Sequence, residues 1–592
     1  MERGVMLKPF RSQSESFRAF KDDGMYYVDK TSFIPYLINM GDKICVVTRP
    51  RRFGKTLMLR TLQTFFEYRL GSDGEPIDNR PYFDGLAVMG AGTKVLAEMG
   101  QYPVISLSFK DVSGETYETI VSMLNDAVRR ACVTTGQMLM SSGKLSHTHR
   151  EWLQTFIDGN ASPDNLAKYL ALYTQWLYDV TNRKTVILLD EYDVPLQKAA
   201  IYDNRHPGTD LFEQTVQIIG QFISSGFKSN NNLAYGIIAG CMRVAKESIF
   251  TGMNNLGVIT VIDNIPDEYW GFTEPEVRKM LKYYDLEDQY EEIEHWYDGY
   301  EYSHRKVFNP WSLLNAVRGF VNGDGDRAIQ SYWARTSGND IIEEMITSNP
   351  SHRHTLARIM EGEPFWAQVF QDLSYRDLKK RPEAIWSFLL FTGYLKSIKL
   401  RQLDTGNWEA LLTIPNMEIR SVMNQAMQHW WRDIKLSGYN AQPLMEALLS
   451  GDIAGIIGET CAIMDDSISV NDAKEDFYHG MLVGVLRTLC RVKSNREYGE
   501  GRPDIVAYMG NSAIILELKC LLPSVVNKYT LEQQFKKVPQ MMNELLDEAE
   551  TQIRSRYYIE GLMFEEPNIA EVKAYAMCFC KKRCAVREVE RR

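Results

Sequence analysis

The sequence lacks any hydrophobic run long enough to cross a membrane, and it lacks a regular cysteine framework. No stretch approaches about eighteen uncharged apolar residues, so a transmembrane helix is not expected. The N-terminal segment MERGVMLKPFRSQ has no apolar core of the signal-peptide kind, so the cytoplasm is the expected compartment. The 9 cysteines are odd in number and scattered over 592 residues, which argues against a disulfide framework.

An excess of basic residues is also absent. The chain has 77 acidic and 67 basic side chains and a net charge of −10, which argues against general coating of nucleic acid. A local basic patch is still compatible with this charge, because only clustered cations are needed to neutralise a phosphate backbone.

Three cysteines near the C-terminus, Cys578, Cys580 and Cys584, form a C-x-C-x3-C cluster. This spacing matches no common zinc pattern, and no histidine lies nearby. We therefore expect buried free thiols on a strand rather than a zinc site.

The first half of the chain alternates short β-branched runs with amphipathic helical patterns, which is typical of a parallel α/β sheet. Residues 266–455 have a mostly helical, aromatic-rich pattern, and the remainder predicts a smaller α/β domain. We expect a P-loop domain at 1–265, a helical connector at 266–455 and a nuclease-like domain at 456–592. The predicted strands of the first domain are 43–48, 104–109, 185–190, 232–239 and 257–262.

Residues 43–56, KICVVTRPRRFGKT, predict a buried strand and a tight loop, and a helical pattern follows. This arrangement suits a polyphosphate, because backbone N–H groups and the helix N-terminus would face the anion. We expect Gly54 to let the backbone approach closely, Lys55 to reach the terminal phosphates and Thr56 to ligate magnesium.

The loop departs from the usual G-x-x-x-x-G-K-[ST] pattern, because Arg49 replaces the first glycine. Without that glycine the loop must turn by a different backbone path, and Pro50 stiffens it. Arg51 and Arg52 are candidates for phosphate contacts or for binding another group.

A second motif, TVILLDE at residues 185–191, ends a predicted strand in two acids. In P-loop enzymes the first acid holds the magnesium shell and the second can activate water, so Asp190 and Glu191 are expected in these roles. Arg243 follows the strand at 232–239 and is a candidate for sensing the γ-phosphate, with a surface salt bridge as the alternative. Together the motifs predict binding of ATP with Mg²⁺.

The segment SNREYGEGRPDIVAYMGNSAIILELK, residues 494–519, predicts two strands joined by a turn at Gly510-Asn511. Glu517 and Lys519 are two apart on one strand and share a face, and Asp504 on the neighbouring strand can approach Glu517. The alternative is a solvent-facing strand edge with alternating charges.

Two carboxylates and an amine in one pocket suit phosphodiester hydrolysis. Asp504 and Glu517 could hold one or two Mg²⁺ or Mn²⁺ ions, while Lys519 positions water or stabilises charge. Close carboxylates repel one another without a cation, so the pocket implies a metal.

With these motifs, the chain resembles a bacterial and archaeal family that joins an AAA-ATPase-like domain to a PD-(D/E)XK nuclease-superfamily domain. The matching segments run in order through most of the chain: YYVDKTSFI (26–34), RPRRFGKT (49–56), LLDEYDVP (188–195), GFTEPEV (271–277), WYDGY (296–300), NPWS (309–312), TSGND (336–340), FTGYL (391–395), IPN (414–416), FYHG (477–480) and SNREYGEGRPD (494–504).

The resemblance implies that the arginine-containing loop is the normal P-loop of the family. It also implies that Asp504, Glu517 and Lys519 form the nuclease core, with Glu475 as a helix-borne metal ligand. Related nucleases often carry Q-x-x-x-Y on the helix after the core. In this chain Tyr557 lies one residue farther from Gln552 than this pattern requires.

Two functions are therefore weighed. The first is an ATP-regulated endonuclease that cuts nucleic acid, with DNA as the expected substrate. The second is a non-enzymatic nucleotide switch whose nuclease fold only docks nucleic acid or a partner. A homo-oligomer is compatible with the sequence but is not specified by it, and no membrane partner is expected.

Overall fold

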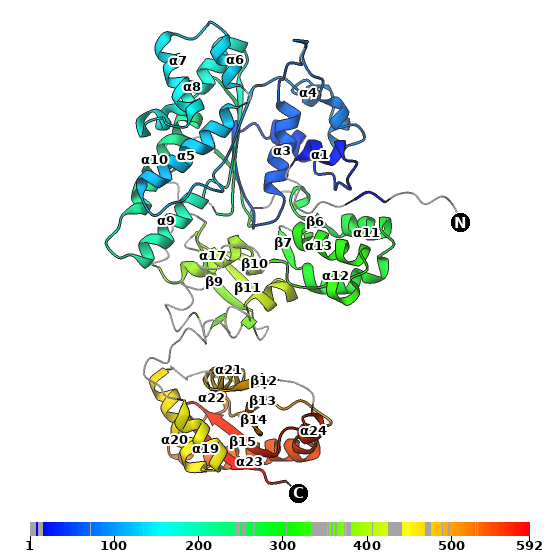
Figure 1. Cartoon of the computed structure of the whole chain (residues 1–592), viewed down its shortest axis with the longest axis vertical. Coiled ribbons are helices and arrows are strands. Elements are labelled where there is room, and N and C mark those ends of the chain that lie inside the picture. The colour runs from blue at the N-terminus through cyan, green and yellow to red at the C-terminus, as the bar shows by residue number, and fades with distance from the viewer. Residues whose placement is uncertain are drawn as a thin grey trace, which may run out of the picture. The chain divides into compact units, whose positions relative to one another are not determined.

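The structure, a computed structural model, divides into two compact units (Figure 1). Unit 1 comprises Met1–Ile341 and Gly362–Val422, and unit 2 comprises Ile342–Glu361 and Met423–Arg592. The structure describes all residues except 1–6, 10–15, 72, 134, 243–248, 251–252, 254–255, 264–266, 303–304, 334–351, 353–354, 357–358, 361–363, 372, 374–380, 405, 424–440, 468–474, 488, 495–497, 527, 530 and 592. Among the described helices, none combines the length and the apolar character needed to cross a membrane.

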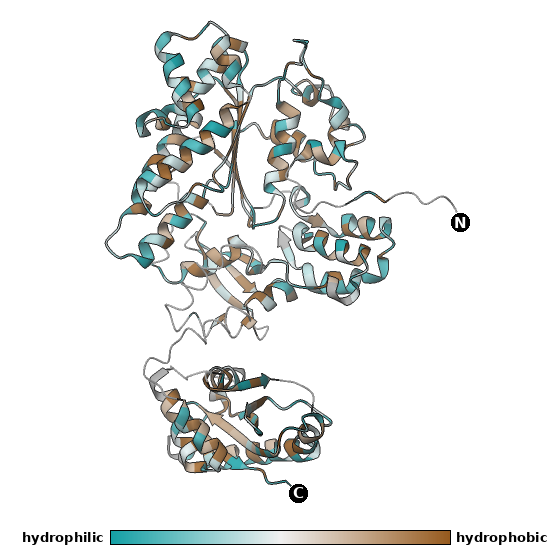
Figure 2. Cartoon of the chain, viewed as in Figure 1, coloured by the Kyte–Doolittle hydropathy of each residue, from teal (hydrophilic) through white to brown (hydrophobic). Residues whose placement is uncertain are grey.

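The core of unit 1 is a five-stranded sheet in the order β2–β3–β4–β1–β5, and every pairing in it is parallel. Both β1 and β3 are buried along their whole length, as expected for strands covered on both faces. Figure 2 shows hydrophobic residues along these central strands. The predicted parallel α/β sheet is thus confirmed, with β1 at Ile44–Thr48, β2 at Val104–Ser108, β3 at Thr185–Asp190, β4 at Leu233–Gly240 and β5 at Leu256–Ile259.

Helices cover both faces of this sheet. One face carries α1 (Phe17–Asp22) and α3 (Lys55–Phe66), and the other carries α5 (Tyr117–Cys132), α8 (Pro163–Thr181) and α10 (Leu211–Phe227) (Figure 1). Local signals set the helix ends. In α8, the Ser162 side chain accepts the Asn165 N–H, Pro163 occupies the first turn, and left-handed Asn182 ends the helix.

The strand order brings three strand ends together. Because β4 lies between β1 and β3, the ends of these strands at Thr48, Asp190 and Gly240 lie at one edge of the sheet. Loops at the carboxyl edge of a parallel sheet commonly bind ligands. Both phosphate-related motifs of the sequence are located at this edge.

The rest of unit 1 contains helices, as expected, and also two small antiparallel sheets. The first sheet has the order β6–β8–β7 and the second has the order β10–β11–β9. The strands of the first sheet are only two to four residues long, so their sequence pattern is weak beside the aromatic helices around them. The strands of the second sheet are five to seven residues long, and the sequence analysis missed them. The elements are β6 (Phe272–Thr273), α11 (Glu274–Tyr283), α12 (Tyr290–Tyr297), β7 (Tyr300–Tyr302), β8 (Arg305–Phe308), α13 (Pro310–Val321), β9 (Phe365–Val369), α17 (Ala384–Thr392), β10 (Lys396–Gln402) and β11 (Trp408–Thr413).

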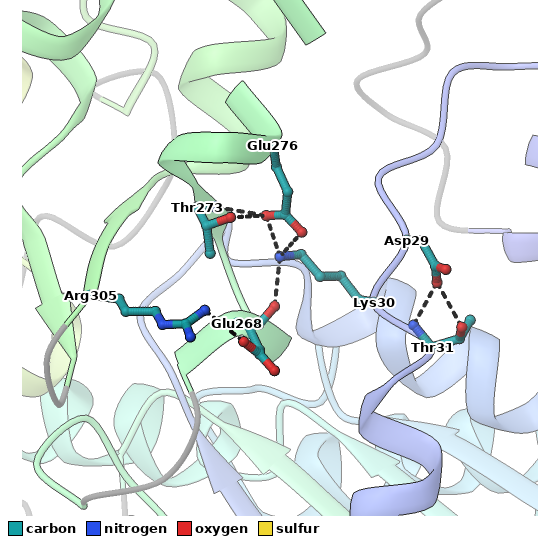
Figure 3. A network of polar contacts seen from close by, with 7 residues as sticks. All are labelled: Asp29, Lys30, Thr31, Glu268, Thr273, Glu276 and Arg305. Atoms are coloured by element: carbon teal, nitrogen blue, oxygen red, sulfur yellow. Dashed lines mark hydrogen bonds and ion pairs between the residues drawn. The ribbon is translucent and has the colours of Figure 1, made fainter. Parts of the chain in front are cut away.

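A buried cation joins this region to the N-terminal segment (Figure 3). Lys30 Nζ donates to both carboxylate oxygens of Glu276 at 2.7 and 2.6 Å and to the Glu268 carbonyl at 2.6 Å. Glu276 also accepts the N–H and hydroxyl of Thr273, which completes a capping box at the start of α11. The region after the parallel sheet is thereby anchored to the residues before it.

Unit 2 is built on a second five-stranded sheet, in the order β12–β13–β14–β15–β16. The β14–β15 pair is parallel and the other pairs are antiparallel. The predicted two-residue turn is confirmed, because Met509 pairs with Ser512 around Gly510, whose φ is 61°. The strands are β12 (Arg491–Ser494), β13 (Ile505–Met509), β14 (Ser512–Cys520), β15 (Glu571–Cys580) and β16 (Arg583–Glu588).

Two hydrophobic cores cover the faces of the unit 2 sheet. Consecutive β14 residues face opposite sides of the sheet, so Leu516 lies in the first core and Ile515 in the second. The first core contains α19 (Gln442–Ser450), α20 (Ile453–Ser467) and α21 (Glu475–Leu486), and the second contains α23 (Leu531–Ser555) and α24 (Tyr558–Glu565). The sequence pattern did not predict β12 and β16. Both are edge strands of the sheet, and each mixes charged residues with only a few apolar ones, so their hydrophobic pattern is weak.

Candidate functional site

The loop between β1 and α3 is tightly turned. Arg52 and Gly54 both have positive φ, 69° and 81°, and Gly54 is the residue that precedes α3. The Lys55 side chain folds back into the loop, where Nζ donates to the carbonyls of Arg49 and Pro50 at 2.8 Å each. A buried ammonium therefore lies inside the loop, at the N-terminus of α3.

The two acids at the end of β3 lie beside this loop. Thr56 Oγ1 donates to Asp190 Oδ2 at 2.6 Å, which joins the first turn of α3 to β3. Burial raises the pKa of Asp190, although the Thr56 hydroxyl and the Lys55 ammonium oppose the shift. Burial and the Asp190 carboxylate raise the pKa of Glu191, whose backbone is left-handed with φ 53°. Paired acids of this kind favour a nearby cation.

A second pair of acids lies in unit 2, at the adjoining ends of β13 and β14. Asp504 Oδ2 accepts the backbone N–H of Leu518 at 2.7 Å, so its carboxylate is held against β14. The Glu517 side chain is only 1% exposed, and its Oε1 lies 3.4 Å from Lys519 Nζ. Burial first and Asp504 second raise the pKa of Glu517 to about 8. The structure therefore brings together the three residues predicted from the sequence.

Lys519 is surrounded by acids. Burial alone would lower its pKa, but Glu517, Glu475 and Asp504 together outweigh burial and raise it. Glu475 begins α21, so a helix outside the sheet contributes to the electrostatics of this pocket.

Comparison with known proteins gives one family match over each of the two regions that contain these residues. Residues 13–250 match the family model described as "Predicted AAA-ATPase", and residues 473–589 match the model of the PD-(D/E)XK nuclease superfamily. The chain joins an AAA-ATPase-like domain to a PD-(D/E)XK nuclease-superfamily domain. It is also 25% identical over 415 residues to "Uncharacterized protein in vnfD 5'region" of Azotobacter chroococcum mcd 1, covering 68% of this chain and 67% of the relative.

In the AAA-ATPase-like domain, the sequence analysis missed Asp193. Its Oδ2 accepts the backbone N–H groups of Cys241 and Met242 at 3.0 and 3.1 Å, which ties the start of α9 (Val194–Arg205) to the end of β4. Burial raises its pKa, with Lys55 opposing. The available signal was the third acid of LLDEYD. Arg243, the predicted γ-phosphate sensor, lies outside the described residues.

The arginines of the P-loop contact neighbouring elements of the protein. The Arg49 guanidinium lies over the Trp270 ring at 5.2 Å, and the Arg52 guanidinium lies over the Trp311 ring at 4.3 Å. Arg51 donates to Gln197 Oε1 of α9 at 3.1 Å. A phosphate-binding role for Arg51 and Arg52 stays a prediction.

The nuclease-like domain has donors that fit a hard divalent cation. Glu517 Oε2 is buried and has no hydrogen-bond partner among the described residues, and a metal would satisfy it. Carboxylate oxygens suit Mg²⁺ or Mn²⁺ better than a soft metal. Within the described part of the chain, no group of three or more His, Cys, Asp or Glu side chains is placed to hold a metal by itself. Glu475 as a metal ligand therefore stays a prediction.

The tyrosine that Gln552 contacts after the nuclease core is Tyr558, and not Tyr557, whose spacing departs from the Q-x-x-x-Y pattern. Gln552 Nε2 donates to the hydroxyl of Tyr558 at 3.2 Å, whereas Tyr557 is 55% exposed. Tyr557 has φ 55° and separates α23 from α24, so this break turns Tyr558 inward. Burial raises the pKa of Tyr558, and Glu517 and Asp504 add to the shift. Sequence spacing alone gave no signal for the break.

The C-terminal cysteines are free and buried, which confirms the expectation of structural thiols. Cys578 and Cys580 lie on β15, and Cys584 lies on β16. Burial raises the pKa of Cys578 to about 12, so the protonated, unreactive form is favoured.

Proposed function

We propose that this protein is an ATP-regulated nuclease that cuts DNA with Mg²⁺ or Mn²⁺. The observation that carries the proposal is the buried pair Asp504 and Glu517 beside Lys519, with one Glu517 oxygen lacking a partner among the described residues. Such a pair is electrostatically costly unless a proton or a cation is present. A bound cation would supply Lewis-acid chemistry at a phosphodiester. Lys519 would orient water or stabilise the developing charge.

The proposed ATPase site uses the edge of the parallel sheet. Lys55 now bonds two neutral carbonyls, and a phosphate oxygen is a stronger acceptor for an ammonium. Thr56 and Asp190 would share the magnesium shell. Glu191 directly follows β3 and would accept a proton from water, and its raised pKa would make it a better base than an exposed glutamate.

Regulation by ATP is proposed because the P-loop packs on the region between the two family matches. The Phe53 ring contacts the Tyr300 ring edge-on at 5.0 Å, and an added Cβ at Gly393 would lie 2.8 Å from Pro50 Cβ. When Lys55 exchanges the carbonyls of Arg49 and Pro50 for phosphate, this loop must adjust. Its contacts would pass the change to the elements around Trp270 and Trp311.

The test is cleavage of supercoiled and linear DNA, and of RNA, by the purified full chain. Reactions run over a Mg²⁺ and Mn²⁺ series, with and without ATP, for the wild type and Asp504→Asn. We expect metal-dependent DNA cleavage that changes with ATP and is lost in the variant. If the protein cleaves RNA and not DNA, RNA replaces DNA as the proposed substrate. Absence of all cleavage by the wild type would favour the non-enzymatic nucleotide switch.

A further inference from the structure

A histidine outside the proposed catalytic set holds the backbone of Asp504. His479, on α21, places Nε2 at 3.0 Å from the Asp504 carbonyl oxygen and at 2.9 Å from Ser494 Oγ. A carbonyl oxygen can only accept, so Nε2 must carry the proton and donate it. The contact thus links α21, the last residue of β12 and the residue that precedes β13.

This contact is separate from the contacts that dock α21. The neighbouring Tyr478 donates its hydroxyl to the Lys581 carbonyl at 2.8 Å, and its ring stacks on Phe579 at 4.3 Å. Leu482 and Leu486 of the same helix are buried in the core. The helix therefore has its own anchors, and loss of the imidazole alone is expected to leave it in place.

Both the backbone and the side chain of Asp504 are fixed by hydrogen bonds. Its carbonyl accepts from the His479 imidazole, and its carboxylate accepts from the Leu518 N–H at 2.7 Å. Glu475 lies four residues before His479 on α21, so both side chains project from one face of the helix. The imidazole contact therefore ties the Asp504 peptide to the helix that also carries Glu475.

We propose that His479 is a positioning residue of the nuclease-like centre, which fixes the Asp504 peptide so that its carboxylate shares one divalent cation with Glu517. This inference rests on the proposed function, because it assumes that the acids bind a metal. Partners that orient metal ligands typically contribute about 10- to 100-fold to metal affinity.

The experiment measures Mn²⁺ binding to the nucleotide-free full chain by calorimetry, so that the readout is independent of cleavage. His479→Ala is expected to weaken binding about 10- to 100-fold. His479→Gln, whose amide nitrogen can occupy a position near Nε2, is expected to restore most of the affinity. Ser494→Ala, which removes the other contact of Nε2 but leaves Asp504 held, is expected to bind Mn²⁺ like the wild type.

Each outcome separates the inference from the proposed function. If Asp504→Asn loses Mn²⁺ binding but His479→Ala keeps it, the positioning role is refuted and the metal centre stands. If neither variant changes Mn²⁺ binding, the metal centre itself is refuted. A loss of affinity in His479→Ala that follows a lowered melting temperature in EDTA and is not rescued by His479→Gln would indicate a structural role only, and would also overturn the inference.

Discussion

Replacing Glu517 by glutamine should make the metal-free protein more stable at alkaline pH. The pKa of Glu517 rises from its ordinary 4.5 to about 8 in the folded protein. The folded state therefore binds more protons than the unfolded state between these values, so the free energy of unfolding falls as pH rises from 4.5 to about 8. Each pKa unit corresponds to about 1.4 kcal/mol, so the full loss is on the order of 5 kcal/mol.

The Glu517→Gln variant removes this ionisation, because an amide is neutral at every pH. We expect it to exceed the wild type in stability by up to about 5 kcal/mol near pH 8.5, with the difference shrinking toward about pH 5. The assay is thermal unfolding of the full chain in EDTA by calorimetry. Hydrogen exchange of peptides that cover β14 assigns the effect to unit 2.

Glu544→Gln is the matched control, since it removes the same charge from an exposed position on α23. Its stability relative to the wild type should not change with pH. Adding Mn²⁺ should make the wild type more stable than Glu517→Gln, because a ligand stabilises only the folded protein that binds it. A difference between Glu517→Gln and the wild type that is the same at every pH would refute the reasoning about this buried carboxyl.

Three further predictions concern the two sites. Lys55→Ala should weaken ATP binding at least about tenfold, because a charge-assisted contact contributes about 1.5–3 kcal/mol; an unchanged dissociation constant in a fluorescent-nucleotide titration would contradict the P-loop assignment. Glu191→Gln should keep ATP binding but slow phosphate release, since an amide cannot accept the proton of water; turnover equal to that of the wild type would exclude it as the base. Lys519→Ala should impair DNA cleavage in the plasmid assay yet still bind Mn²⁺, because it removes an amine and no metal ligand. Full cleavage by this variant would exclude a catalytic role for Lys519.

Much of the architecture could be predicted because the signals are local. Runs such as TVILLD are apolar throughout, and a strand buried on both faces requires that pattern. The turn at Gly510-Asn511 and the alternation of Glu517 and Lys519 along β14 likewise follow from neighbouring residues alone. The short strands β6 and β12 could not be predicted, because too few residues carry their pattern.

The pairing of distant side chains was decided only by the tertiary structure. The sequence by itself supplied the candidate residues of both sites: Lys55, Asp190, Asp504 and Glu517 were all found from local motifs. The sequence could not place β4 between β1 and β3, turn Tyr558 rather than Tyr557 toward Gln552, or bring His479 to the Asp504 carbonyl. These contacts depend on how helices and strands pack across long stretches of chain, and a local pattern carries no information on that packing.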